Sequence, residues 1–129
     1  LGDVYKRQLV DLINLVSLRT GYSIGGFDAD KIQGDSLELG IGRAEEPFEG
    51  IGRGTLNIEG LPVYRDRAGG IGTPTSDNER TKMGLETRRI LAIVNGYNGR
   101  EGLAEAAGMI QELLRKYADS DGGTILYFE

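Results

Sequence analysis

The fold is decided by residues 69–81, GGIGTPTSDNERT, which precede the apolar segment RILAIV at residues 89–94. Glycine lets a backbone turn or approach a neighbour where a side chain would clash, and the hydroxyls and charges of the same run can converge on one ligand. The apolar segment has apolar residues at successive positions, so we expect it to be a central strand covered on both faces. Together the two segments predict a binding loop carried by a rigid scaffold.

Hydrophobic periodicity predicts a helix on either side of this region. Four apolar residues recur at the spacing i, i+3, i+4 and i+7, which predicts a helix that ends before Gly21: Leu9, Leu12, Ile13 and Val16. A wider apolar stripe predicts a second helix between residues 100 and 117, formed by Leu103, Ala106, Ala107, Ile110, Leu113, Leu114 and Tyr117.

Short strands are expected between and after these helices. Leu37, Leu39 and Ile41 alternate with polar or glycine residues, as in a half-buried strand, and Leu56 and Ile58 form a second alternation. The strand expected at residues 62–64 begins with proline, which indicates an edge strand or an entry from a turn. A closing buried strand is expected at residues 124–128, after a turn at residues 121–123. The pattern predicts an α+β or layered α/β domain rather than a regular βαβ winding.

Composition restricts the chemistry of the chain. Its 129 residues suffice for one domain, and a net charge of −5 with a pI near 4.8 disfavours non-specific binding to DNA or RNA backbones. The 21 glycines are more than twice the usual share of about 7%. The absence of cysteine and histidine excludes disulfides, thiol nucleophiles and imidazole bases. The absence of cysteine fits a reducing compartment, so we expect a cytoplasmic protein. No apolar run approaches the roughly 18 residues of a membrane span, so we expect no membrane contact.

The first eight residues, LGDVYKRQ, are interpreted as a sequencing scar and set aside from fold reasoning, because they lack an initiator methionine. Residues 9–129 are then expected to be the C-terminal portion of a domain. If part of a sheet is missing upstream, an exposed strand edge or apolar patch is expected.

Within the glycine-rich run, the best candidates for ligand contact are Asp77, Glu79 and Arg80. Each has a structural alternative: Asp77 can cap a helix or turn, and Arg80 can form an ion pair within the fold. A cationic cluster of Arg80, Lys82, Arg88 and Arg89 is the one candidate for local nucleic-acid contact, and a solvated strand edge is the favoured alternative.

The hydroxyl groups of Thr73, Thr75 and Ser76 can position a water molecule or bind an ester, although no Gly-x-Ser-x-Gly elbow is present. Asp28 and Asp30 would share one side of an extended segment and could hold magnesium, but a turn stabilised by bonds to nearby backbone amides is favoured. No resident metal or cofactor is therefore expected.

Four stretches in combination resemble the B3/B4 domain: NLVSLRTGYSIGGFDADKI at residues 14–32, GIGRG at 50–54, NIEGLPV at 57–63 and GTPTSD at 72–77. This domain occurs in the β subunit of bacterial phenylalanyl-tRNA synthetase and in smaller stand-alone proteins. The resemblance to the stand-alone branch covers nearly all of residues 9–129, and members of that branch are longer at the front.

The resemblance implies a layered mixed β-sheet domain with flanking helices, and an editing function in which mischarged aminoacyl-tRNA is hydrolysed. Editing provides a second sieve where one pocket cannot reject a near-isostere. The implied substrate-binding residues are Gly25, Gly26, Asp28, Gly72, Thr73, Thr75, Ser76, Asp77, Glu79 and Arg80.

Two stretches and one single position depart from the synthetase pattern. Gly25-Gly26-Phe27-Asp28 replaces His-Ala-Phe-Asp, residues 73–78 replace a pocket loop Ala-Gly-Val-Met-Gly-Gly, and Ile93 replaces the glutamate that reads the tyrosine hydroxyl. Losing a buried polar reader removes the discrimination that such a group provides. The resemblance therefore implies the synthetase scaffold with different side chains lining its pocket, and these departures argue against tyrosine editing as such.

The leading hypothesis is a stand-alone domain that recognises the 3′ end of an aminoacyl-tRNA and hydrolyses the ester. Without histidine, hydrolysis would need water positioned by backbone amides and by Thr73, Thr75 or Asp77, helped by the ribose hydroxyl of the substrate. The alternatives are a non-catalytic module that binds RNA or an amino-acid-like ligand, and a structural domain without a ligand.

Overall fold

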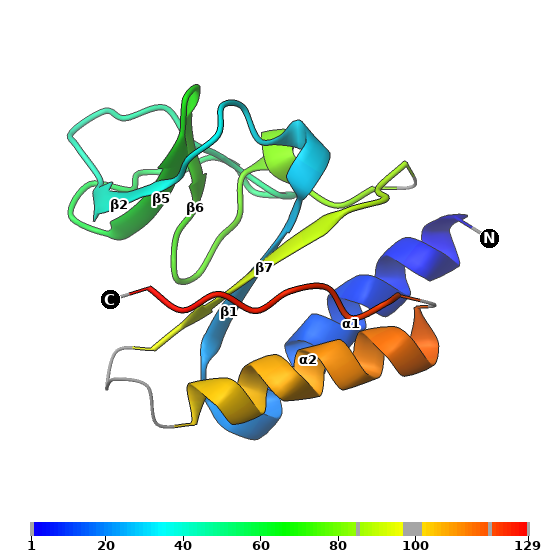
Figure 1. Ribbon diagram of the computed structural model, residues 1–129. Coiled ribbons are helices and arrows are strands. Elements are labelled where there is room, and N and C mark those ends of the chain that lie inside the picture. Colours follow the sequence, from blue (N-terminus) through cyan, green and yellow to red (C-terminus); the bar gives the residue numbers. More distant parts are fainter. Residues whose placement is uncertain (1, 85, 97–101, 119, 129) are drawn as a thin grey trace. The chain divides into compact units, whose positions relative to one another are not determined.

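Figure 1 shows the computed structural model of the protein. It describes residues 2–84, 86–96, 102–118 and 120–128. The chain divides into two compact units, one formed by residues 1–24 with 94–129 and the other by residues 25–93.

The first unit contains the two predicted helices, α1 (Gly2–Thr20) and α2 (Leu103–Tyr117), which lie side by side (Figure 1). Helix α1 buries Leu9, Ile13 and Val16, which are spaced by about one or two turns, as the sequence predicted. The helix begins at Gly2, so the segment LGDVYKRQ, which was interpreted as a sequencing scar, is helical from its second residue, and the helix ends before Gly21 as predicted.

Helix α2 confirms the second predicted helix, although residues 100 and 101 lie outside the described residues. Ala106 and Ile110 form the buried centre of its stripe, whereas Tyr117 at its end is exposed. Arg115 and Lys116 occupy the last turn, where positive charge complements the helix dipole.

The expected strand at residues 124–128 is wrong. These residues have no regular secondary structure, and the side chains of Leu126 and Phe128 are 71% and 87% exposed. The preceding turn instead bonds to α2: Gln111 Nε2 donates to the carbonyls of Gly122 and Gly123 at 3.0 and 3.1 Å. An apolar run alone does not provide the neighbouring strand that a buried strand needs.

Strand β7 (Ile90–Asn95) confirms the strand expected after the glycine-rich run, but its expected central position is wrong. In the described part of the chain it pairs only with β1 (Ser23–Asp28), beside which it lies in Figure 1. All six residues of β7 are half-buried. Consecutive apolar residues alone therefore do not indicate a central strand.

The second unit contains a three-stranded antiparallel sheet of β2 (Glu38–Ile41), β5 (Pro62–Asp66) and β6 (Gly69–Gly72), in the order β2-β5-β6. The strand expected to begin with proline is therefore central, and the edge alternative was wrong. Pro62 stands at the first position of β5, opposite Ile41, so its missing N–H falls at the end of the ladder.

Strand β2 faces the core with glycines rather than with its apolar residues. Leu39 and Ile41 are 63% and 60% exposed, so the half-buried pattern predicted for them was wrong. Gly42 is buried, and a Cβ atom there would lie 1.9 Å from the carbonyl oxygen of Ile58. The backbone of Ile58 thus approaches too closely for any side chain, which periodicity cannot reveal.

A small apolar core supports this sheet. Phe48, Ile58 and Val63 are fully buried together, with Leu56 packed against them. The nearby hairpin of β3 (Glu49–Gly50) and β4 (Gly54–Thr55) ends before Leu56. The second predicted alternation is therefore core-facing chain that follows a strand, rather than a strand itself.

Asp66, at the end of β5, connects three parts of the second unit. Its buried carboxylate accepts two hydrogen bonds of 2.9 Å from the guanidinium of Arg80, and one of 2.8 Å from the amide of Gln33. It also accepts from the amides of Ala68 and Gly69, which shapes the turn into β6. The ion pair with Arg80 extends the contacts of Asp66 to the helical turn η2 (Glu79–Thr81).

Burial by itself raises the pKa of Asp66, but the hydrogen bonds from Arg80, Gln33 and Ala68 outweigh it and lower the pKa to about 2. The stabilisation is therefore complete above the unfolded pKa near 4 and is lost as the pH falls towards 2.

We expect Arg80→Ala to lower the free energy of unfolding by about 2–4 kcal/mol at pH 7, because it leaves a buried carboxylate without its cation. Urea denaturation at pH 7 and pH 3 measures the effect, which should be smaller at pH 3. Arg67→Ala, an exposed neighbour, is the matched control. A loss for Arg80→Ala no greater than for the control would contradict this role.

Candidate functional site

The candidate site is centred on Asp77, in the segment that follows β6. Gly72 and Asp77 form an isolated antiparallel bridge, and the amide of Asn78 donates to the carbonyl of Ile71 at 2.8 Å. The amide of Ile51 donates to the carbonyl of Asp77 at 3.0 Å. Residues 69–72 of the predicted binding loop are strand β6, and the chain after them turns back tightly to pair with its end. Backbone hydrogen bonds on two sides fix the position of Asp77.

Glycines from two strands surround the Asp77 carboxylate. A Cβ atom built on Gly72 would lie 3.1 Å from Oδ1 of Asp77, and one on Gly25 would lie 3.5 Å from the same oxygen. The amide of Gly26 donates a hydrogen bond to the carboxylate. Strand β1 and the end of β6 thus meet at Asp77, and the structure brings these glycines and Asp77 close together.

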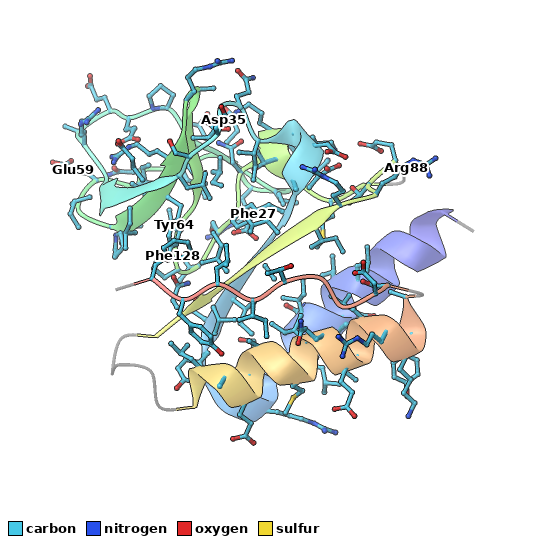
Figure 2. The ribbon with its side chains drawn as sticks, in the orientation of Figure 1. Phe27, Asp35, Glu59, Tyr64, Arg88 and Phe128 are labelled. Atoms are coloured by element: carbon cyan, nitrogen blue, oxygen red, sulfur yellow. The ribbon has the colours of Figure 1, made fainter. Side chains whose placement is uncertain are left out.

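The ring of Phe27 is the apolar floor of this arrangement. Phe27 is 1% exposed, and Figure 2 shows it between β1 and the chain that follows β6. Its Cζ atom lies 2.7 Å from the Cβ position of Gly72 and 2.9 Å from that of Gly25. The ring therefore occupies the space that side chains at these two glycines would take.

Burial raises the pKa of Asp77 to about 6, and the hydrogen bond from Gly26 only partly opposes this. No lysine or arginine in the described ranges forms an ion pair with Asp77. The carboxylate is ionised at pH 7, and its proton affinity lies in the range useful for accepting a proton or binding a cation.

The hydroxyl group of Thr73 is used within its own turn. Thr73 Oγ1 accepts from the amides of Thr75 and Ser76 at 3.4 and 3.1 Å and donates to the carbonyl of Ser76 at 3.2 Å. Ser76 Oγ accepts a hydrogen bond of 2.7 Å from Arg53 Nη1, and Thr75 is exposed. These bonds favour a structural role for Thr73 and Ser76 and leave Thr75 at the surface.

Most of the predicted cationic cluster is paired with acids. Arg80 binds Asp66 through two hydrogen bonds, Lys82 Nζ binds Glu79 Oε1, and Arg89 Nε lies 2.9 Å from Asp30 Oδ1. Arg88 is exposed and projects away from Phe27 (Figure 2). The structural alternative for Arg80 is thus the one that its contacts favour, and Glu79 turns towards Lys82.

Asp28 supports the fold next to the site. Its Oδ1 accepts from the amide of Asp30 at 2.9 Å and starts the helical turn η1 (Ala29–Lys31), and its Oδ2 accepts from the hydroxyl of Thr87 at 2.8 Å. Asp28 is buried whereas Asp30 is exposed. This is the turn that was favoured over a magnesium site, and the described residues contain no cluster of three or more metal-binding side chains.

Sequence reasoning missed two contributors to the site. Asn78, not Asp77, caps η2 by accepting from the amide of Arg80 at 2.9 Å, and its Nδ2 donates to the carbonyl of Gly70. Phe27 supplies the floor, although the sequence showed only that it follows two glycines. An Asn directly before a Glu-Arg-Thr turn is a recognisable capping signal, which frees Asp77 from that role.

The predicted site residues therefore separate into groups. Gly25, Gly26, Gly72 and Asp77 come together around Phe27; the others belong to the Thr73–Ser76 turn, the Arg80–Asp66 pair, the Glu79–Lys82 pair or the Asp28–Thr87 contact.

Comparison with known proteins gives one family. A family model described as the B3/4 domain matches residues 2–117. No curated protein and no solved structure gave a significant match. Neither helix of the described chain is long and apolar enough to cross a bilayer.

We expect Asp77→Asn to change how stability depends on pH. Because the folded pKa is near 6 and the unfolded value near 4, the folded wild type binds more protons between these values and loses stability as the pH rises through them. The asparagine variant lacks this term and still accepts from Gly26.

The stability advantage of Asp77→Asn over the wild type should grow by about 1–3 kcal/mol between pH 4 and pH 7, since one pKa unit corresponds to about 1.4 kcal/mol. Urea denaturation at several pH values measures this difference, in which the contributions of other carboxylates cancel. A difference independent of pH would show that Asp77 titrates normally.

Gly72→Ala should destabilise the protein by about 1–3 kcal/mol, because its methyl group overlaps the buried ring of Phe27. Gly108→Ala, in helix α2 with no atom within 4 Å of the added carbon, should instead be neutral or stabilising. Thermal unfolding compares the two variants. Equal stability of Gly72→Ala and the wild type would mean that the glycine wall is not close-packed.

Proposed function

The chain belongs to the B3/4 domain family, which is associated with tRNA synthetases, and on this premise we propose that it binds the 3′ end of an aminoacyl-tRNA and hydrolyses a mischarged amino acid from it. The observation that carries the proposal is the Asp77 carboxylate, held between the glycines of β1 and β6 with a pKa near 6 and without a cation partner among the described residues.

The aminoacyl end of a tRNA offers groups that suit such a site. It carries an ester carbonyl, ribose hydroxyls and a basic amino group within a few bonds of one another. A carboxylate fixed by backbone bonds can orient these groups without reorganisation, and orientation is a large part of the advantage of an enzyme over water. Backbone amides and the ribose hydroxyl of the substrate would complete the positioning of the attacking water.

Among the three catalytic candidates, Asp77 has the strongest support. Thr73 is committed to its turn and Thr75 is exposed, whereas Asp77 is half-buried and ionised at pH 7. The departures from the synthetase pattern at Gly25, Gly26 and Ile93 favour an amino acid other than tyrosine. The protein is proposed to act on tRNA in the cytoplasm, without a cofactor.

A non-catalytic binding module is the second candidate. The engagement of Thr73 and Ser76 in structural bonds favours it, since these hydroxyl groups are then not available to position water. Such a module would use the same Asp77-centred surface to hold an amino-acid derivative or RNA end.

Incubation of the full chain with a panel of tRNAs, each carrying a non-cognate amino acid, tests the proposal. We expect release of at least one amino acid, a loss of about 10-fold or more in Asp77→Asn, and no more than about a twofold change in the exposed, charge-matched control Asp35→Asn. Binding of tRNA without any deacylation would support the binding module instead. If the chain neither binds nor deacylates any of these tRNAs, both proposed functions are contradicted.

A further inference from the structure

Strand β2 has a free outer edge, because β5 is the one strand of the described chain that pairs with it (Figure 1). The amide of Gly42 donates to the carbonyl of Leu61, which directs Gly42 towards the chain that enters β5. Successive residues of an extended chain direct their backbone groups to opposite sides, so those of Ile41 and Arg43 point to the free edge. Pro62, which stands opposite Ile41, has no N–H to donate and agrees with this direction.

The side chains of Arg65 and Glu46 bind the backbone groups of this free edge. Arg65 Nη2 donates to the carbonyl of Ile41 at 2.8 Å, and Glu46 Oε1 accepts from the amide of Arg43 at 2.9 Å. The two side chains also bind each other, with 2.8 Å from Nε to Oε2 and 2.7 Å from Nη2 to Oε1. The pair thus offers β2 one donor and one acceptor, as the backbone of a neighbouring strand would.

Gly40 allows the guanidinium of Arg65 to lie across β2. A Cβ atom on Gly40 would overlap Nη1 of Arg65, so a side chain at this position displaces the guanidinium. The side chains of Arg65 and Glu46 are only 15% and 10% exposed, although they cover an edge strand. The hydrogen bonds from Arg65 lower the pKa of Glu46 to about 2, against the opposing effect of burial, so the pair stays charged at neutral pH.

The sequence of β2 is complementary to a second copy of itself. Two copies paired antiparallel about Gly40 would place Leu39 of each copy opposite Ile41 of the other. Side chains directly opposite each other lie on one face of such a pair and contact each other. Leu39 and Ile41 are largely exposed in the single chain, so this pairing would bury apolar surface on both copies.

We propose that the Arg65–Glu46 pair blocks the antiparallel pairing of β2 with a second copy of this chain. In that pairing the amide of Leu39 from one copy would donate to the carbonyl of Ile41 in the other. Arg65 already donates to this carbonyl, and its guanidinium lies where the incoming strand would approach. An exposed apolar edge strand is a site of association unless it is covered or charged, and here an ion pair covers it. The inference is independent of the proposed function at Asp77.

Sedimentation equilibrium of the full chain tests the inference. Glu46→Leu combined with Arg65→Met removes both charges together, so that no lone charge remains. We expect this double variant to dimerise at least about 10-fold more tightly than the wild type, because the backbone groups of the edge become free to pair. The matched control makes the same exchange at an exposed ion pair, Asp30→Leu with Arg89→Met, and should associate as the wild type does.

Adding Leu39→Lys to the double variant should reverse the association, because a lysine on an edge strand opposes pairing. Association that persists with Leu39→Lys would overturn the inference, since it would not involve β2. A folded double variant that associates no more tightly than the wild type would overturn it as well.

Gly40→Ala provides a second route if circular dichroism shows that the double variant is unfolded. Its methyl group displaces the guanidinium of Arg65 while both charged residues remain, so it should also strengthen association. A Gly40→Ala chain that associates as the wild type does would then overturn the inference. A wild-type dimer that Leu39→Lys dissociates would contradict it directly, because the edge would then pair despite the ion pair.

Discussion

The Asp77 carboxylate can lie against β1 only because Gly25 and Gly72 carry no side chains. A single carbon at either position would overlap the ring of Phe27, and at Gly72 it would also press on the carboxylate. The close approach creates the environment that matters chemically. It removes water from one side of the carboxylate, which raises its pKa, and it brings the amide of Gly26 within hydrogen-bonding reach of the carboxylate. The geometry and the electrostatics of the candidate site therefore have one common cause.

The surrounding structure holds this approach in place. Asp66 and Arg80 connect the β5–β6 hairpin to η2, and Asn78 caps η2 while donating to Gly70. The chain next to Asp77 is thus held by the Asn78 hydrogen bonds and by the Asp66–Arg80 ion pair, in which each charge has its partner. Asp77 differs from its neighbours in this respect, since its one identified donor is a backbone amide. The Asp77 carboxylate has no ion-pair partner among the described residues, whereas the nearby Asp66 and Arg80 do, and this difference points to a ligand.

Periodicity predicted the two helices well, because an apolar stripe at helical spacing is the pattern of a helix with one buried face. Leu9, Ile13 and Val16, which are buried in α1, form such a stripe. It failed for β2, where the core side is glycine and the apolar Leu39 and Ile41 face outward. It failed again at residues 124–128, where apolar residues lack a partner strand. Local sequence does not specify which distant backbone approaches, and both failures follow from that. The same limit is the reason why Asp77 could be nominated but Phe27 could not, and why Arg80 could not be assigned to Asp66 from the sequence.

Membership of the B3/4 domain family places the chain in the context of tRNA synthetases, and the proposed activity depends on what Asp77 does in that context. The most direct measurement is the ¹³C NMR titration of the Asp77 carboxyl carbon, in the free protein and with a bound 3′-amide analogue of alanyl-adenosine, which mimics the aminoacyl end of a tRNA and is not hydrolysed. We predict a pKa near 6 in the free protein and a clear decrease in the complex, because a bound ammonium favours the ionised carboxylate. A pKa near 4 that does not change on adding the amide would contradict the central role of Asp77.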